Sequence, residues 1–278
     1  MNITIIGLGL IGGSMAIDLK KRRFADTVYG VDNKTLHAET AKNTGLIDEI
    51  TDLETGIEKA ELIILATPVD ASLKLLPKIL DLIDNQTVTD VCSTKNGICK
   101  IVKEHPKRKN FVASHPMAGT EYSGPWAAVS HLFDGKSTFI CNAEESSEKA
   151  LKDVEDLYGT LNMRIINMEA RAHDIHAAFV SHISHISSFA LALTVLEKET
   201  NEKQIFNMAG GGFRSTVRLA KSSSDMWTPI FAQNSENIIE VIDTYIEKIQ
   251  SFKKGIKNKN LSEINALIYK ANKIKRVI

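Results

Sequence analysis

The chain has 278 residues, of which 43% are hydrophobic and 24% charged, proportions typical of a water-soluble globular protein with two domains. Its 34 basic residues balance its 34 acidic ones, which argues against a nucleic-acid partner or an anionic membrane surface. Three cysteines without a Cys-x-x-Cys pair indicate a reduced, cytoplasmic protein. We read neither a leader nor an apolar run of roughly 20 residues, and therefore expect no membrane insertion.

The first part of the chain alternates β-rich runs with helical patterns. The expected strands lie at 2–6, 28–31, 62–66, 87–91, 111–113, 137–141 and 164–167. Helices are predicted between them, among others at 14–23, 71–82 and 145–158. Strands of continuous apolar character separated by helices indicate a parallel sheet covered on both faces. We therefore expect an α/β fold, with a Rossmann-type doubly wound sheet forming a first domain over residues 1–167.

Residues 168–278 are expected to be all-α. The predicted helices lie at 169–198, 202–209, 213–221, 229–254 and 261–275. In 177–196 apolar residues occupy nearly every helical face, which predicts burial among other helices. The lysine-rich end of the chain has apolar residues at helical spacing, which favours a solvated helix face over a nucleic-acid surface. A helical region of this kind is expected to bury part of its surface against a second subunit.

The segment ITIIGLGLIGGS has the G-x-G-x-x-G spacing between an expected strand and an expected helix. Gly7 permits a tight turn, Gly9 lets the backbone approach a pyrophosphate, and Gly12 allows the helix to pack closely on the strand. Asp32 follows at the end of the second strand, where its carboxylate would accept hydrogen bonds from a ribose and repel a 2′-phosphate. The pattern favours NAD, although the next residues, Asn33 and Lys34, leave NADP open.

Four further residues are assigned to the cofactor site. Leu10 and Ile11 lie within the glycine motif, at the start of the helix whose free N–H groups would face a phosphate. Thr67 and Pro68 follow the strand at 62–66, so their loop should lie at the same edge of the sheet. Simple termination of the strand explains Thr67 and Pro68 equally well.

Three other segments combine loop residues with reactive side chains. They are DVCSTKNG at 90–97, SHPMAGTE at 114–121 and AGGGFRSTVRLAKSS at 209–223. The first two follow expected strands, where open α/β sheets bind ligands. In the third, a glycine run that includes Gly211 allows a ligand to approach the backbone beside Arg214 and Arg218, whose guanidinium groups suit carboxylates. His115 in the second segment is a candidate base, metal ligand or buried structural residue.

With these motifs the chain resembles the prephenate dehydrogenases and the related arogenate and cyclohexadienyl dehydrogenases of tyrosine biosynthesis. The resemblance covers essentially the whole chain and rests on the glycine motif, the Asp-Val-x-Ser-x-Lys segment, the HPMAGTE loop, SHISHISS, and GGGFRSTVR followed by Trp227. It implies NAD-dependent oxidative decarboxylation of prephenate to 4-hydroxyphenylpyruvate by a homodimer. From the length of the chain we expect a monofunctional enzyme. Arogenate, which has an amine in place of the side-chain keto group, remains an alternative substrate.

The resemblance also implies roles for individual residues. His115 would be the base that takes the proton of the ring hydroxyl, a task that suits an uncharged imidazole. Ser93 would orient that hydroxyl or the nicotinamide, and Arg218 would hold a substrate carboxylate. Glu121 matches a position that gates the site. Many relatives have an aspartate where this chain has Ser215, so whether this chain has an ionic gate is an open question. The remaining matches near the substrate are Lys95, His182, His185, Gly211 and Trp227.

Each assignment has an alternative. The i, i+3 spacing of two histidine pairs suggests zinc, but no nearby cysteine or acid completes a ligand set, so no metal is expected. The pairs are His173 with His176 and His182 with His185. A hydroxy-acid dehydrogenase of similar architecture usually needs a lysine base on the long interdomain helix, which here has none before Lys198. A sensor that binds NAD without turnover would not need a histidine, a serine and an arginine around one cleft.

Overall fold

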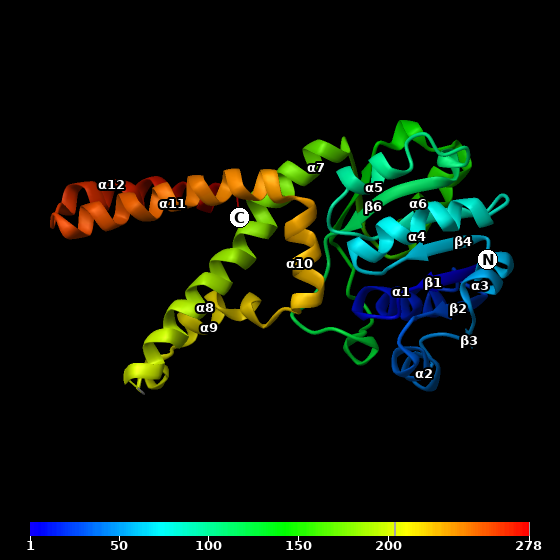
Figure 1. Cartoon of the computed structure of the whole chain (residues 1–278), viewed down its shortest axis with the longest axis horizontal. Coiled ribbons are helices and arrows are strands. Elements are labelled where there is room, and N and C mark those ends of the chain that lie inside the picture. Colours follow the sequence, from blue (N-terminus) through cyan, green and yellow to red (C-terminus); the bar gives the residue numbers. More distant parts are fainter. Residues whose placement is uncertain (203, 278) are drawn as a thin grey trace. The chain divides into compact units, whose positions relative to one another are not determined.

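A mostly parallel sheet forms the centre of the first of two compact units. The computed structural model describes residues 1–202 and 204–277, and the two units are Met1–Asn234 and Ser235–Ile278. The sheet has eight strands in the order β3-β2-β1-β4-β5-β6-β7-β8 (Figure 1). In chain order the strands are β1 Asn2–Ile6, β2 Thr27–Val31, β3 Glu49–Ile50, β4 Leu62–Leu65, β5 Thr87–Asp90, β6 Phe111–Pro116, β7 Ser137–Cys141 and β8 Arg164–Met168.

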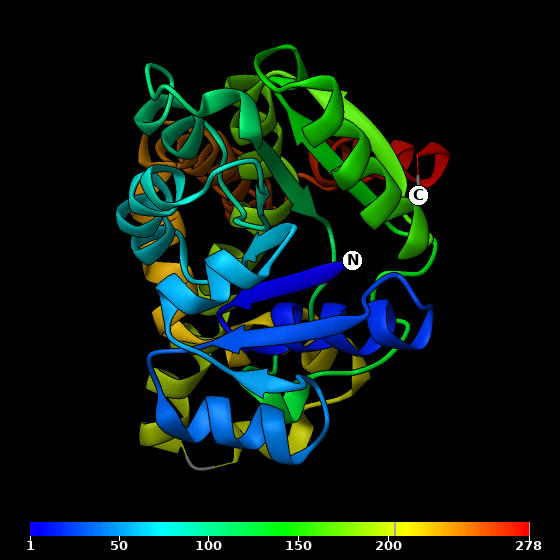
Figure 2. The same cartoon turned by 90° about the vertical axis from the view of Figure 1, so that its right-hand side faces the viewer.

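Helices cover both faces of this sheet. One face carries α1 (Leu10–Lys21), α2 (Thr35–Asn43) and α6 (Glu148–Thr160), and the other carries α3 (Leu53–Lys59), α4 (Val69–Leu82) and α5 (Asn96–Ile101). Side chains alternate along a strand, so in β1 Ile3 and Ile5 enter the first core whereas Ile6 enters the second. Figure 2 shows β1 beside its parallel partner β2. The predicted doubly wound α/β fold is confirmed.

One pair of strands departs from the expected parallel sheet. β7 runs antiparallel to β6, with Pro116 opposite Thr138, whereas the other neighbouring pairs described are parallel. The connection 117–136 therefore leaves and re-enters the sheet at the same end of β6. Its second half is attached to α1, because Val129 donates its backbone N–H to Ser14 Oγ at 3.0 Å. Sequence patterning could not show this reversal, because the alternation of side chains along a strand is the same in either direction.

The rest of the first unit is helical. After β8 come α7 (Ala170–Ala177), the π-helix η4 (Ala178–His182), α8 (Ile183–Glu202), η5 (Ile205–Met208), α9 (Gly211–Thr216), η6 (Arg218–Lys221) and α10 (Ser224–Gln233). The predicted helix at 169–198 is thus interrupted by a π turn, whose additional residue rotates the following side chains relative to α7. Trp227 and Ile230 of α10 join the core on the α4 side of the sheet.

The second unit contains two helices joined by a tight turn. They are α11 (Ser235–Lys257) and α12 (Leu261–Ala271), followed by the short helix η7 (Asn272–Arg276). The turn ends at Asn260, whose side chain accepts the Glu263 backbone N–H at 3.1 Å and caps α12. Gly255 lets the helices approach closely, because a Cβ there would lie 3.0 Å from Ile264 Cγ1. The single helix predicted at 229–254 is in fact α10 and most of α11.

Apolar side chains along the α7 to α8 stretch are exposed in the single chain. Phe179, Val180 and Leu193 are 46%, 67% and 66% exposed. Within the single chain the stretch is therefore not buried on every face, which differs from the expected burial among other helices unless a second subunit covers it. The segment Ala170–Glu199 is also long and apolar enough to cross a membrane by those two criteria alone, with mean hydropathy 1.5 and 11% of its window buried. The sequence-based view that no apolar run approaches this length was wrong.

Several short elements were not predicted. They are the two-residue strand β3 and the helices α2, α3 and α5. Their sequences are polar or short, so hydrophobic periodicity gives little signal there. The strands β1 and β7 agree with the prediction at both ends, and β6 extends three residues further than expected, through Pro116.

Candidate active site

His115 lies on a strand and not in a loop. β6 continues through Ser114, His115 and Pro116, and His115 is paired with Phe139 of β7. Its side chain is 8% exposed. Pairing with β7 fixes the backbone beneath the imidazole, which is more rigid support than the loop expected from the sequence.

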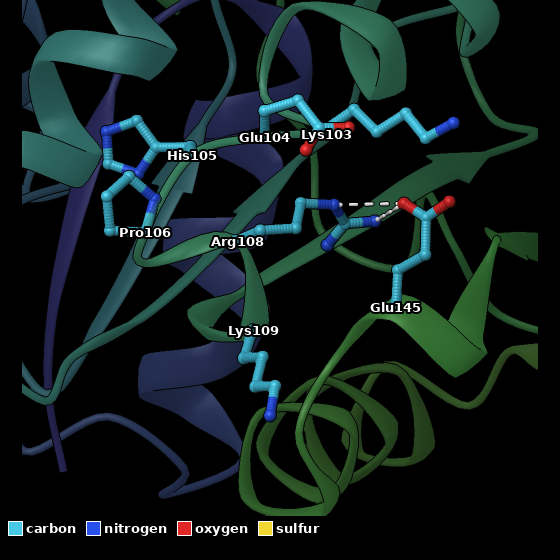
Figure 3. A pocket seen from close by; sticks show the side chains of 7 residues that line it. All are labelled: Lys103, Glu104, His105, Pro106, Arg108, Lys109 and Glu145. Carbon is cyan, nitrogen blue, oxygen red and sulfur yellow. Dashed lines mark hydrogen bonds and ion pairs between the residues drawn. The ribbon is translucent and has the colours of Figure 1, made fainter.

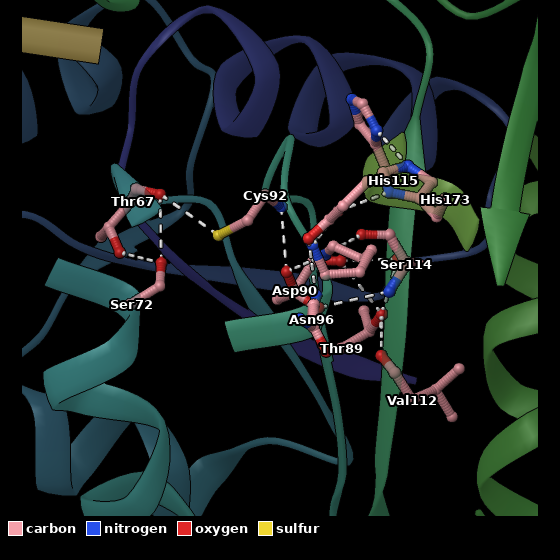
Figure 4. A network of polar contacts seen from close by, with 12 residues as sticks. Thr67, Ser72, Thr89, Asp90, Cys92, Asn96, Val112, Ser114, His115 and His173 are labelled. Carbon is pink, nitrogen blue, oxygen red and sulfur yellow. Dashed lines mark hydrogen bonds and ion pairs between the residues drawn. The ribbon is translucent and has the colours of Figure 1, made fainter. Parts of the chain in front are cut away.

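Two neighbouring residues of α7 connect His115 to a carboxylate. His115 Nδ1 lies 2.9 Å from His173 Nε2 (Figure 4). His173 Nδ1 lies 2.9 Å from Asp174 Oδ1. The Asp174 carboxylate also accepts the backbone N–H groups of Lys95 at 2.7 Å and Asn96 at 2.9 Å. His173 and Asp174 are 3% and 2% exposed, so this chain of contacts lies in the protein interior.

A buried ion pair supports the backbone on the other side of His115. Lys95 Nζ contacts Asp90 Oδ2 and donates to the carbonyl oxygen of Ser114 at 2.6 Å, and both charged side chains are fully buried. Ser114 donates its backbone N–H to Asp90 Oδ1 at 3.2 Å, and its hydroxyl lies 2.5 Å from Tyr158 Oη. Burial would lower the pKa of Lys95, but Asp90 raises it overall. Lys95 therefore positions the strand that carries His115 and adds positive potential beside it.

The surroundings of His115 favour its uncharged form. Burial, followed by His173, Lys95 and His182, lowers the pKa of His115 well below the ordinary value of 6.5. An imidazole is an effective proton acceptor at neutral pH only when it is uncharged. The site thus provides a neutral base at the end of β6.

A group of aromatic and imidazole rings lies next to Asp174. His185 stacks on Trp227 with ring centroids 3.5 Å apart, and His182 meets the same indole edge-on at 5.9 Å. Asn234 donates through Nδ2 to the backbone oxygen of Asp174 at 2.7 Å and lies 3.2 Å from His182 Nδ1. Burial lowers the pKa of His182 to about 4. The Nε1 atom of Trp227 is buried and has no acceptor among the described residues, so it is available to a ligand.

The predicted arginine and gate residues lie together. Arg218 Nη1 forms a 3.0 Å ion pair with Glu121 Oε2, and the Arg218 side chain is 52% exposed. Arg214 is also exposed, and its Nε donates to the backbone oxygen of Ala209. Ser215 and Gly211, which begins α9, are exposed as well. Glu121 borders a hollow of about 460 Å³ whose lining is Glu121, Tyr122, Ser123, Trp126, Ala127 and Val129.

The glycine motif has the geometry that a dinucleotide requires. Gly7 has φ +99°, and a Cβ there would lie 2.5 Å from the Ala66 carbonyl oxygen. At Gly12 a Cβ would lie 2.1 Å from the Gly7 carbonyl oxygen. A Cβ on Gly9, by contrast, would meet nothing within 4 Å, which leaves space for a phosphate at the start of α1. No side chain caps that helix, so its first N–H groups remain available among the described residues.

The other predicted cofactor residues lie around this motif. Asp32 accepts the Leu8 N–H through Oδ2 at 2.9 Å and the Lys34 N–H through Oδ1 at 2.8 Å, so its carboxylate is held against the glycine motif. Thr67 lies two residues after the end of β4, and its backbone N would be 2.9 Å from a Cβ on Gly7. Its hydroxyl lies 2.8 Å from Ser72 Oγ. Pro68 begins α4 as its N-cap residue. Leu10 and Ile11 form the first turn of α1. Ser93 is half-buried in the loop between β5 and α5.

A separate hollow of about 320 Å³ lies at the opposite end of β6 (Figure 3). It is lined by Lys103, Glu104, His105, Pro106, Arg108, Lys109 and Glu145. The Arg108 guanidinium donates to Glu145 Oε2 at 2.7 and 3.1 Å, so its charge is already paired. β6 begins at Phe111, which places this hollow about 13 Å along the strand from His115. It belongs to a different part of the sheet from the candidate site.

The histidines that suggested a metal site have other neighbours. His173 contacts His115 and Asp174, His182 contacts Asn234, and His176 is exposed. Within 1–202 and 204–277 no three His, Cys, Asp or Glu side chains are grouped as metal ligands. Sequence reasoning missed Asp174 and treated His173 only as a possible metal ligand. The adjacent His-Asp pair just after the last strand was the available signal.

Comparisons with known proteins agree with this geometry. The family model described as the prephenate dehydrogenase nucleotide-binding domain matches residues 15–167, and that of the prephenate dehydrogenase dimerization domain matches 169–270. The chain is 31% identical to the prephenate dehydrogenase of Lactococcus lactis subsp. cremoris, over 99% of this chain and 77% of that protein.

Two solved structures have the same fold over nearly the whole chain. Prephenate dehydrogenase from A. aeolicus, in complex with hydroxyphenyl propionate and NAD+, is 31% identical, with a TM-score of 0.89 over 100% of this chain and 97% of that one. Synechocystis arogenate dehydrogenase is 26% identical, with a TM-score of 0.78 over 99% of each chain.

Proposed function

The chain belongs to the prephenate dehydrogenase family, and we propose from this membership that it catalyses the NAD-dependent oxidative decarboxylation of prephenate to 4-hydroxyphenylpyruvate. The observation that carries the proposal is His115, a buried imidazole held on a strand with its pKa far below 6.5. Such a group accepts a proton at neutral pH. It lies at the end of β6, at the edge of the sheet where the glycine motif follows β1.

We propose the following proton and electron movements. His115 accepts the proton of the ring hydroxyl as hydride leaves the carbon that bears it. Loss of the ring carboxylate as CO2 then supplies the electron pair that completes the aromatic ring, and the proton returns to the phenolic oxygen. Ser93 orients the ring hydroxyl or the nicotinamide. Formation of the aromatic ring makes the step effectively irreversible.

The other end of the substrate is assigned to the helical part of the first unit. Arg218 binds a carboxylate by a charge-assisted contact, and Glu121 occupies Arg218 until substrate arrives. The unpaired Trp227 Nε1 donor supports a polar substrate group beside His182. Gly211, at the exposed start of α9, is retained as a substrate contact because it lets a ligand approach the backbone.

NAD fits the residues of the glycine motif. Gly9 leaves room for the pyrophosphate, α1 offers uncapped N–H donors, and Asp32 places a carboxylate where the adenosine ribose would lie. Leu10, Ile11, Thr67 and Pro68 complete the proposed contact surface. When bound, NAD would accept the hydride. The acidic residue disfavours a 2′-phosphate and hence NADP.

We also propose a cytoplasmic homodimer. The exposed apolar side chains of Phe179, Val180 and Leu193 lie in the region that matches the family's dimerization domain, and a second copy would cover them. This explains the apolar length of Ala170–Glu199 without a membrane. The three cysteines are free and buried, which suits a reducing compartment. We retain 1–167 as the NAD-binding domain and 168–278 as the substrate and dimerisation domain.

The assay that tests the function follows NADH or NADPH formation spectrophotometrically. Prephenate and arogenate are each tried with NAD and with NADP. We expect turnover of prephenate with NAD. Preferential turnover of arogenate would instead support the activity in the name of the Synechocystis relative, and no turnover of either substrate would overturn the proposal.

A further inference from the structure

We infer that His173 and Asp174 act as positioning residues for His115: they fix its imidazole with the hydrogen on Nδ1, so that Nε2 is the atom that accepts the substrate proton. The inference rests on the proposed function for the identity of the proton donor. The fixed arrangement of hydrogens, however, follows from the contacts alone and can be tested without turnover.

The assignment starts from Asp174, because both of its carboxylate oxygens accept hydrogen bonds from backbone N–H groups. Its Oδ1 receives the backbone N–H of Lys95 and its Oδ2 that of Asn96, and backbone N–H groups only donate. Asn234 holds the same residue from the other side by donating to its backbone oxygen. Asp174 is therefore fixed in place with its oxygen atoms available only as acceptors.

The next step assigns the hydrogens of the two imidazoles. His173 Nδ1 lies 2.9 Å from Asp174 Oδ1, so this nitrogen carries the hydrogen. A neutral imidazole has one N–H, which leaves a lone pair on His173 Nε2. His115 Nδ1 lies 2.9 Å from that lone pair and must in turn be the donor. The lone pair of His115 is then on Nε2, the nitrogen that makes no contact with this chain of residues.

Packing keeps the rings in this arrangement. The His115 and His173 rings meet edge-on at 5.0 Å between centroids, and Phe139 of β7 packs edge-on against His173 at 5.6 Å. The charged or titratable groups that face the two imidazoles are Lys95 beside β6, Asp174 on α7 and His182 on η4. Burial and the positive charge of Lys95 both oppose a second proton on His115.

The competing arrangement is a doubly protonated His173. It would donate from both nitrogens, make His115 Nδ1 the acceptor and leave the hydrogen on His115 Nε2, where it blocks proton abstraction. The two arrangements predict opposite positions for the His115 hydrogen. A tautomer measurement therefore separates them directly.

The first experiment measures the imidazole nitrogens by NMR in ¹⁵N-histidine-labelled protein, with the His115→Asn variant used to assign the signals. We expect His115 to have the hydrogen on Nδ1 at neutral pH. Hydrogen on Nε2 in the wild-type protein would overturn the inference. Because this readout needs no substrate, it stays informative even if neither prephenate nor arogenate is turned over.

The second experiment compares substitutions at two histidines of α7. His173→Leu removes the acceptor for His115 Nδ1–H, and we expect kcat to fall about 10- to 100-fold with little change in KM. His173→Gln offers an amide oxygen as a substitute acceptor and should restore most of the loss. His176→Gln, at an exposed position of the same helix, is the matched control and should leave kcat unchanged.

Two results would contradict the role of His173. One is a wild-type kcat and pH profile in His173→Leu. The other is an equal loss in His173→Gln and His173→Leu together with an unchanged His115 tautomer, which would indicate a purely structural effect. Thermal unfolding of each variant shows whether it is folded, and the NMR signal of His115 in His173→Gln provides the test if His173→Leu is not.

Discussion

Glu121 and Arg218 form a 3.0 Å ion pair although 97 residues separate them in the chain. The pair joins the connection after β6 to the short helix η6. A hydrogen bond from its own backbone N–H and the contact with the Arg218 guanidinium lower the pKa of the Glu121 carboxyl. In the proposed mechanism a substrate carboxylate competes with Glu121 for Arg218, and we propose that this pair acts as an ionic gate without an aspartate at position 215.

Replacing Arg218 tests this competition. We expect Arg218→Gln to raise the KM for prephenate roughly 10- to 100-fold, since a hydrogen bond to a charged group contributes about 1.5 to 3 kcal/mol. The effect on kcat should be smaller. Steady-state kinetics with Arg214→Gln as the control, four residues away and exposed, makes the comparison specific. An unchanged KM in Arg218→Gln would mean that the carboxylate is held elsewhere.

The base function of His115 predicts a loss confined to the chemical step. His115→Asn should lower kcat by about 10²- to 10⁴-fold, the usual contribution of a positioned proton acceptor, with KM for both substrates nearly unchanged. Initial-rate measurements at saturating NAD give both constants. A variant that retains the wild-type kcat removes His115 from the mechanism.

The pH dependence follows from the lowered pKa of His115. Burial, His173 and Lys95 keep the imidazole neutral well below pH 6.5, and protonation abolishes the base. We expect kcat/KM to be constant through neutral pH and to fall on the acid side with a midpoint well below 6.5. Profiles that decline already above pH 6.5 would show that another group controls the reaction.

Asp32 predicts the choice of cofactor. Asp32→Asn removes the negative charge that repels a 2′-phosphate, so kcat/KM for NADP should rise relative to that for NAD by roughly ten-fold, or about 1.4 kcal/mol. The amide oxygen can still accept the Leu8 N–H, whereas the Lys34 N–H loses its acceptor on this side chain. The measurement is the ratio of kcat/KM values for the two cofactors. A ratio equal to that of the wild-type enzyme would assign the discrimination to other residues.

The proposed dimer depends on the exposed apolar side chains of α8. Leu193→Glu should shift the mass in sedimentation equilibrium from twice 30.7 kDa towards the single chain, because it would bury a charge in the interface. Leu82→Glu places the same substitution at an exposed leucine of α4 and serves as the control. A wild-type protein that is already monomeric at assay concentrations would contradict the proposal.

Much of the fold was predictable because short β-rich runs, above all the apolar strand β4, alternate with helical patterns, and because the glycine motif lies between a strand and a helix. The reversal of β7 was not, since the alternation of side chains along a strand is the same in either direction. The π turn before His182 was also missed, because its sequence is compatible with an ordinary helix. The sequence therefore predicted the secondary structure around the site more accurately than it predicted how the elements are arranged in space.

The candidate site shows the same division. The motifs identified His115, Arg218 and Glu121 without revealing that the last two form an ion pair. His173 was visible only as one of four histidines, and Asp174 was not singled out at all. His115 and His173 are 58 residues apart in the sequence. They lie on a strand and a helix that meet only in the folded chain.

The antiparallel pairing of β6 with β7 also bears on how this enzyme can diversify. Because β7 pairs antiparallel with β6, residues 117–136 leave the sheet after Pro116 and return to it at the same end of β6, close to His115. An insertion or deletion in the exposed part of this connection around Tyr122 and Ser123 would change neither the register of the sheet nor the position of the imidazole. The length of the connection between β6 and β7 can therefore vary in evolution while the proposed proton acceptor, His115, keeps its position.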